Sequence, residues 1–211
     1  MLRHLAKALF LFALLLSPFL HASSTEQDFQ EGEIAFYHEN YIEAHKYLTK
    51  ASSQGDSRSN YYLGVMNLHG KGTPVNYKEA VRFFTLGASK NHPQSQIALG
   101  VLMVEGIGLP KNYRKASILF TKAAQKGRPD AQLILGWIYK HGLGVKESNA
   151  VAYALWNYVA AQGDEWARIN RDAIVLEMSE SELYRAQELS SNLSRLWKLL
   201  AQNKNTRMRQ V

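Results

Sequence analysis

The feature that most constrains the fold is a stretch of 36 residues that recurs twice more along the chain. In the copy that begins near Asn60 a Leu63-Gly64 pair stands inside an apolar run, and this pair returns as Leu99-Gly100 and Leu135-Gly136. Paired glycines, alanines and bulky apolar residues recur in matching columns. A period between about 20 and 50 residues indicates stacked supersecondary units. We therefore expect most of the chain to be one unit repeated.

Each unit predicts two helices, and the first of them spans residues 58–69 in this copy. In the next copy the corresponding residues 97–104 are apolar nearly all round, which suits a helix packed on several sides. Glycine inside a helix costs about 1 kcal/mol relative to alanine. Because Gly64, Gly100 and Gly136 share one register, we expect glycine to remove a side chain where two helices cross closely.

The second helix is predicted from about Tyr77 to Lys90. Paired glycines precede it and permit positive φ in the loop. One helical face carries apolar residues at three- and four-residue spacing: Ala80, Phe83, Phe84 and Ala88. Left-handed residues are expected where the second helices end, at Asn91, Gly127 and Gly163.

These columns resemble the Sel-1-like repeat family, the 36-residue relative of the tetratricopeptide repeat. The copy from Ala131 to Asp164 matches best, with Ala131, Leu135-Gly136, Tyr139, Gly142, Gly144, Val145, Ala152, Trp156, Ala160-Ala161 and Gly163. The departures are Asn67 and Met103 in the tyrosine column and Ser148 or Asn149 where an acidic residue is usual. The resemblance implies an all-α fold: a right-handed α-solenoid of stacked antiparallel helix pairs, a tetratricopeptide-like superhelix, with C-terminal capping helices.

The chain is accordingly divided as follows: a secretory signal peptide over residues 1–22, a tetratricopeptide-like N-terminal repeat over 23–57, three repeats over 58–93, 94–129 and 130–165, C-terminal capping helices over 166–200, and a basic disordered tail over 201–211. In the N-terminal repeat the distance from Gly32 to Ala44 is four residues shorter than in the later copies. This unit is therefore expected to lack the glycine loop and to cap the stack.

Two capping helices are expected after the last repeat. The first is predicted from Glu165 to Met178, with an inner side made of Trp166, Ile169, Ala173 and Leu176. Ser179 and Glu182 form a capping box that starts the second. That helix is expected to turn these residues inward: Leu183, Ala186, Leu189, Leu193, Leu196, Trp197 and Leu200.

The N-terminus has the features of a secretory signal. Arg3 and Lys7 precede an apolar run over residues 8–20, which is too short to span a bilayer comfortably and ends near the small residue Ala22. We expect cleavage after Ala22, a periplasmic or secreted protein, and no stable membrane insertion after cleavage. The alternative is an uncleaved N-terminal anchor. The chain has no cysteine, so it can form no disulfide.

The positive charge lies mostly at the C-terminus. The formal charge of +7 falls to +5 once Arg3 and Lys7 are removed, and five basic residues beyond Glu188 account for that +5. The body of the protein is therefore formally neutral. Nucleic-acid binding would require a basic stripe across the folded face, so no nucleic-acid partner is expected. The tail is expected to be solvated; contact with an anionic membrane or the cell wall is the alternative.

No motif indicates catalysis. The sequence contains no Ser-x-x-Lys, no Gly-x-Ser-x-Gly and no His-Glu-x-x-His, so neither an enzyme nor a cofactor is expected. One column carries His69, Glu105 and His141, which together could suggest a metal site. Neighbouring helices lie about 8 to 10 Å apart, however, whereas zinc ligands lie about 2 Å from the ion. No metal is expected, and these residues are interpreted as polar groove or loop positions.

The resemblance also implies a binding surface on the first helix of each pair, at positions three before the glycine and one, four and five after it. The three full repeats place these residues there: Tyr61, Val65, Leu68, His69, Ile97, Val101, Val104, Glu105, Leu133, Trp137, Lys140 and His141. The N-terminal repeat adds Phe29, Phe36 and Tyr37. About half are expected to pack against neighbouring helices. The others are expected to form an apolar trough with a polar rim, and exposed apolar patches usually mark interaction sites.

The functional hypothesis is a non-enzymatic protein–protein interaction scaffold of the bacterial envelope that holds a segment of another protein or a peptide in this groove, with the scaffold itself a monomer. The alternatives are a modulator or binder of cell-wall (peptidoglycan) enzymes or fragments, and an exported host-interaction factor. Direct hydrolysis by paired carboxylates needs two acids about 5 to 9.5 Å apart. The acidic groove positions, Glu33 and Glu105, stand two repeats apart.

Overall fold

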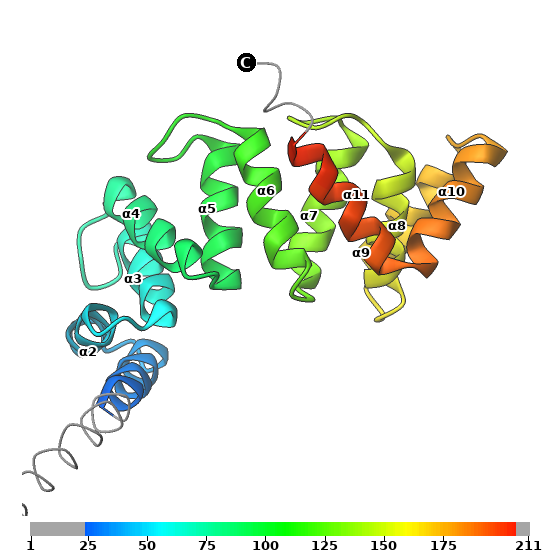
Figure 1. Cartoon of the computed structure of the whole chain (residues 1–211). Coiled ribbons are helices and arrows are strands. Elements are labelled where there is room, and N and C mark those ends of the chain that lie inside the picture. Colours follow the sequence, from blue (N-terminus) through cyan, green and yellow to red (C-terminus); the bar gives the residue numbers. More distant parts are fainter. Residues whose placement is uncertain (1–23, 206–211) are drawn as a thin grey trace, which may run out of the picture. The chain divides into compact units, whose positions relative to one another are not determined.

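The computed structural model describes the backbone of residues 24–205 and the side chains of residues 24–202, and all regular elements within them are helices (Figure 1). The predicted signal peptide and cleavage site, and residues 206–211 of the predicted tail, lie outside the described residues. Within the described part, no helix combines the length and hydrophobicity needed to cross a membrane.

Contacts divide the chain into two compact units, one ending at Lys90 and the other beginning at Asn91. The first contains a helix over residues 24–37, called the N-terminal helix below, and α2 (Tyr41–Ser53), α3 (Ser57–His69) and α4 (Tyr77–Ser89). The second contains α5 (Pro93–Glu105), α6 (Tyr113–Ala124), α7 (Pro129–Lys140), α8 (Asn149–Ala160), α9 (Glu165–Val175), α10 (Glu180–Ser191) and α11 (Leu193–Asn205).

Consecutive helices pack as pairs. α3 lies against α4, α5 against α6 and α7 against α8, and within the second unit α6 also packs on α7. The first helix of each pair is called the A helix below, and the second the B helix. The expected all-α solenoid of antiparallel helix pairs is confirmed (Figure 1).

A contact between a glycine and an aromatic ring lies at the centre of each full helix pair. A Cβ atom built on Gly100 of α5 would lie 2.8 Å from Cζ of Phe120 on α6, closer than the 3.0 Å that real Cβ atoms respect. Both residues are buried. The same relation joins Gly64 to Phe84 and Gly136 to Trp156. The prediction that glycine removes a side chain where two helices cross is therefore confirmed.

A backbone hydrogen bond closes the loop inside each pair. The amide of Asn112, the residue that caps α6, donates to the carbonyl oxygen of Met103 at 2.8 Å. The equivalent bonds run from Asn76 to Asn67 at 2.8 Å and from Ser148 to Tyr139 at 2.9 Å. The acceptors all belong to the tyrosine column. Because the bond uses only the main chain, asparagine and methionine can replace tyrosine there without opening the loop.

The N-terminal repeat uses the same contact with a shorter connection. A Cβ atom on Gly32 would lie 2.7 Å from Cγ of Leu48, a residue of α2 that is fully buried. Residues 38–40 alone link the N-terminal helix to α2, where the later pairs have a glycine-containing loop. The expected loss of the glycine loop is confirmed.

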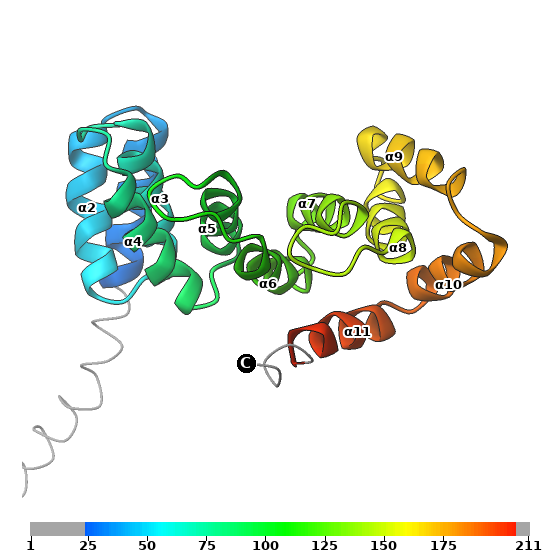
Figure 2. The ribbon, with the colours of Figure 1, turned by 90° about the horizontal axis from the view of Figure 1, so that it is seen from above.

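The repeat pattern is lost in α9, where the glycine column holds a charge. The position 36 residues after Gly136 is Asp172, which accepts hydrogen bonds from Arg168 and Arg171. An ion-paired carboxylate leaves no room for the ring of a following B helix. α10 accordingly packs on α8, and Figure 2 shows α9 on one side of α8 with α10 and α11 on the other.

The C-terminal helices correct the sequence-based expectation in two respects. α9 ends at Val175, and α9 buries Ala167 and Ile174, while Trp166, Ile169, Ala173 and Leu176, predicted to face inward, are exposed. The helix expected after Ser179 is two helices with a break at Asn192, and α11 continues to Asn205, beyond the predicted start of the tail at residue 201. The capping box of Ser179 and Glu182 is confirmed, and Ala186, Leu189, Leu196 and Leu200 are buried.

The glycine-to-ring contact can be tested with Gly100→Ala. On an uncontacted helix surface this change would stabilise by about 1 kcal/mol through helix propensity. Here the added methyl group meets the Phe120 ring, so we expect the free energy of unfolding to fall by about 1 to 3 kcal/mol in urea denaturation. Adding Phe120→Leu should make the double variant more stable than the sum of the two single effects. Additive effects would contradict the contact.

Candidate binding surface

Eleven of the twelve predicted groove residues lie on the A helices, His141 directly follows α7, and none of the twelve is buried. At about 100° per residue, their positions relative to the glycine column place them on one flank of the glycine face of each A helix. Tyr61, Val65, Leu68 and His69 belong to the first unit, and the other eight belong to the second.

In the second unit the predicted residues divide between exposed and half-buried positions. Val101, Glu105, Trp137 and His141 are exposed, whereas Ile97, Val104, Leu133 and Lys140 are half-buried. The three half-buried aliphatic residues pack against the core formed by α6, α7 and α8. The expectation that about half of the set packs against neighbouring helices therefore holds in this unit.

An apolar pocket of about 270 Å³ lies between α7 and α9, lined by Leu133, Ile134, Trp137 and Trp166. The ring of the lining residue Trp166 meets that of buried Trp156 edge-on, with ring centroids 5.7 Å apart. The Trp156 indole Nε1 donates to the carbonyl oxygen of Leu133 at 3.2 Å. This hydrogen bond satisfies the backbone carbonyl group of Leu133 on α7. Of the lining residues, only Leu133 and Trp137 belong to the predicted groove.

The predicted polar rim is partly used within the chain itself. Lys140 at the end of α7 forms an ion pair with Glu177, the second residue after α9, and so joins the two helices that flank the pocket. The ring of His141 packs on that of Trp137, with centroids 4.8 Å apart. Trp137 nevertheless remains 41% exposed. Lys140 is therefore already paired within the chain.

Sequence reasoning missed the contribution of α9. Ile169, Ala173, Leu176 and Glu177 follow Leu133, Trp137, Lys140 and His141 by 36 residues, so they occupy the same groove columns. Leu176 is 89% exposed, and Ile169 is also exposed. The signal that could have identified them is this continued count, which is obscured because the glycine column no longer holds glycine.

In the first unit the predicted residues adjoin an aromatic cluster. Tyr61 is half-buried beside Tyr62 and Phe84, with ring centroids 5.5 and 6.1 Å away. The prediction that Phe29 lines the groove is wrong. Phe29 is buried in the core, with its ring against Tyr62 and under the guanidinium of Arg58, which is 3.8 Å from the ring centroid.

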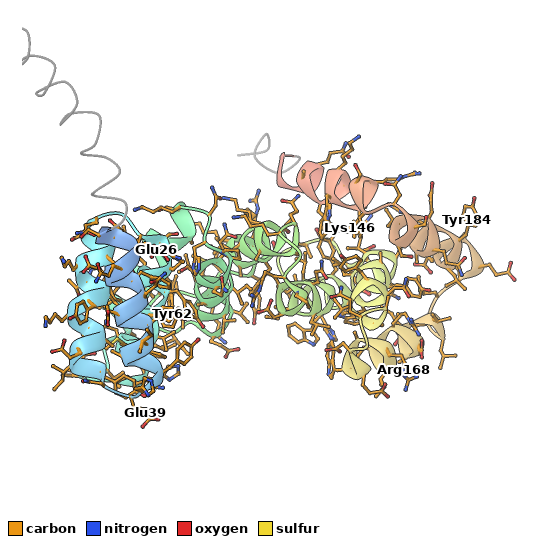
Figure 3. The ribbon with its side chains drawn as sticks, turned by 90° about the horizontal axis from the view of Figure 1, so that it is seen from below. Glu26, Glu39, Tyr62, Lys146, Arg168 and Tyr184 are labelled. Atoms are coloured by element: carbon orange, nitrogen blue, oxygen red, sulfur yellow. The ribbon has the colours of Figure 1, made fainter. Side chains whose placement is uncertain are left out.

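The hydroxyl group of Tyr62 connects α3 to the N-terminal helix (Figure 3). It donates to a carboxylate oxygen of Glu33 and lies 3.2 Å from the hydroxyl oxygen of Tyr37. Burial raises the pKa of Tyr62, and the hydrogen bond to Glu33 raises it further. Phe36 and Tyr37, also predicted to line the groove, are half-buried and exposed, respectively.

No metal-binding cluster forms among the residues that the structure describes: no three His, Asp or Glu side chains gather closely enough to hold an ion. The column that could have supplied metal ligands is not brought together: His69 belongs to the first unit, whereas in the second unit Glu105 ends α5 and His141 follows α7.

Comparisons with known proteins agree with this geometry. A family model described as Sel1 repeat matches residues 29–56, 57–92, 93–127 and 129–164. The crystal structure of a Sel1 repeat protein from Oxalobacter formigenes is 27% identical, covers 77% of this chain and 72% of that chain, and has a TM-score of 0.65. A protective antigen present in uropathogenic Escherichia coli strains, which displays an SLR fold, is 23% identical with a TM-score of 0.55. This match covers 84% of this chain and 48% of the antigen, and it shows the fold alone. No curated protein matches the chain significantly.

Tryptophan fluorescence can test the exposure of the pocket. Trp137 and Trp166 are 41% and 47% exposed, whereas Trp156 is 2% exposed. We therefore expect Trp137→Phe and Trp166→Phe each to reduce the fraction of fluorescence that acrylamide quenches, and Trp156→Phe to leave the quenchable emission in place. Quenching that is unchanged in the first two variants would place their rings in the interior.

The raised pKa of Tyr62 predicts a pH dependence of stability. As pH rises through about 10 the unfolded tyrosine ionises first, so the stabilisation from the protonated hydroxyl is present below that pH and is lost above it. The difference in unfolding free energy between the wild type and Tyr62→Phe should therefore shrink between about pH 9 and about pH 11, by up to about 1.4 kcal/mol per pH unit above pH 10. Urea denaturation at each pH measures it, and a constant difference would contradict the assignment.

Proposed function

The chain belongs to the Sel1 repeat family, and we propose that it is a non-enzymatic scaffold that binds a segment of a partner protein on the predicted groove residues of α5 and α7 in its second unit. Sel1 repeat proteins generally serve as protein–protein interaction scaffolds. The partner segment lies along the predicted groove residues and makes no covalent bond with them.

The observation that carries this proposal is the exposed apolar surface of the second unit. Val101 and Trp137 are large apolar residues that the fold leaves 38% and 41% exposed, and Trp137 lines a pocket whose lining is entirely apolar. Covering such surface contributes about 25 cal/mol per Å², before the costs of association and ordering. Aromatic anchors commonly supply most of the energy of protein interfaces. A rigid surface of this kind favours holding a partner over changing it chemically.

The envelope location is part of the same proposal and depends on residues 1–22. A basic start, a short apolar run and small Ala22 support secretion to the periplasm or beyond. N-terminal sequencing of the protein purified from its native cells should begin at Ser23. A protein that begins at Met1 would remove the basis for an envelope partner without affecting the groove.

The proposed function can be tested by cross-linking and pull-down from the native envelope, followed by affinity measurements on the captured protein. We expect Trp137→Ala combined with Val101→Ala, both in the second unit, to weaken binding at least about thirtyfold, as the loss of an interface anchor does. Tyr184→Ala is the matched control, because Tyr184 is an exposed tyrosine on α10, away from α7 and α9 across α8 (Figure 3).

Unchanged binding by the double variant, with its thermal unfolding preserved, would refute the groove. Capture of peptidoglycan fragments in place of a protein, sensitive to the same two substitutions, would favour the cell-wall alternative. Selective capture of a cell-wall hydrolase would identify that enzyme as the partner and keep the scaffold function.

A further inference from the structure

We propose that the pocket between α7 and α9 anchors the partner by taking one large uncharged apolar side chain, such as leucine, methionine or phenylalanine, from the bound protein segment. This inference rests on the proposed function and names the part of the surface that selects the partner. Its occupant follows from the size, the lining and the charges of the site.

The size of the pocket suits a side chain. Its volume of about 270 Å³ lies below the range of about 300 to 1,000 Å³ that is usual for cofactor and drug-sized ligand sites. The wall on one side is Trp166, whose ring is held edge-on against buried Trp156, and the wall on the other is α7. A single bulky side chain fits in such a space, because an apolar cavity of about 150 Å³ already takes a benzene ring.

The lining of the pocket selects an apolar group. Leu133, Ile134, Trp137 and Trp166 present only apolar surface to it. The carbonyl oxygen of Leu133 already accepts a hydrogen bond from Trp156. A sugar or a charged group placed here would lose its water without gaining hydrogen bonds, which is costly. The chemistry of the lining therefore favours a protein side chain over a cell-wall glycan.

The charges beside the pocket are already paired within the chain. Lys140 pairs with Glu177, and Arg168 pairs with Glu165 and Asp172 on α9. Arg171 contacts Asp172 and also donates to Asn157 on α8. These cations are therefore not free to select an acidic partner. Binding is expected to depend on apolar contact and only weakly on salt.

The exposed face of α9 extends the apolar surface beyond the pocket. Ile169, Ala173 and Leu176 occupy the groove columns that continue from α7 onto α9, and Ile169 and Leu176 are more than half exposed. α10 packs on α8 and leaves this face uncovered in the described part of the chain. The partner segment is therefore expected to carry further apolar residues next to the anchor, aligned along α9.

A displayed library of random peptides tests the inference on the full mature chain. Enriched peptides should share one large apolar residue, and replacing that residue with serine in the synthetic peptide should weaken binding at least about tenfold. Trp166→Ser in the protein should weaken binding similarly, and the two changes together should cost clearly less than the product of their separate effects. Tyr184→Ser is the matched control and should leave binding unchanged. Raising salt from about 50 to about 200 mM should alter the affinity less than about twofold.

The serine-substituted peptide keeps the test valid even if Trp166→Ser impairs folding, because it leaves the protein unchanged. Multiplicative effects of the two substitutions would overturn the inference, as would enriched peptides that are mainly charged and lose affinity in salt. Peptides that respond to Val101→Asp and Trp137→Ala but not to Trp166→Ser would overturn the inference and leave the proposed function standing. No enrichment, or binding only by chitin and peptidoglycan oligosaccharides, would overturn both.

Discussion

The fit of a glycine against an aromatic ring is the interaction on which the rest of this structure depends. Where Gly64, Gly100 and Gly136 remove a side chain, the ring of the next helix enters and sets both the distance and the rotation of the pair. The predicted groove columns lie on one flank of this contact, because they stand three residues before and one, four and five residues after the glycine. Whether a column is exposed therefore depends on which further helix packs beside the pair.

The helix after the last repeat, α9, lacks the glycine that makes this contact. In α9 the glycine column holds Asp172, whose carboxylate is paired with Arg168 and Arg171, so no B helix packs there in the described chain. α10 packs on α8 instead and seals the core from that side. α9 consequently keeps its apolar face exposed and shares a pocket with α7. The helix that has lost the glycine column therefore also contributes part of the surface proposed to bind a partner.

Much of the fold could be predicted from the sequence because the period of the repeat reports a local geometry. The helix bounds, the loops with positive φ and the crossing at Gly100 follow from recurring residue types and their spacing. The prediction for α9 was wrong because its apolar spacing was interpreted as an inner face. An amphipathic pattern identifies an apolar side, but it does not say whether another element covers that side. The prediction that Phe29 lines the groove was wrong for the opposite reason, since Arg58 and Tyr62 from α3 cover its ring.

By itself the sequence determined the repeating unit, the glycine contact inside each pair and the columns that could face a partner, because these depend on residues close together along the chain. Only the tertiary structure decided that Lys140 forms an ion pair with Glu177 and that Trp166 packs edge-on against Trp156 at the side of a pocket. It also decided that α10 packs on α8 and leaves α9 uncovered. Each of these depends on where helices separated in sequence come to lie. Such placement follows from packing across the whole unit, and no local pattern encodes it.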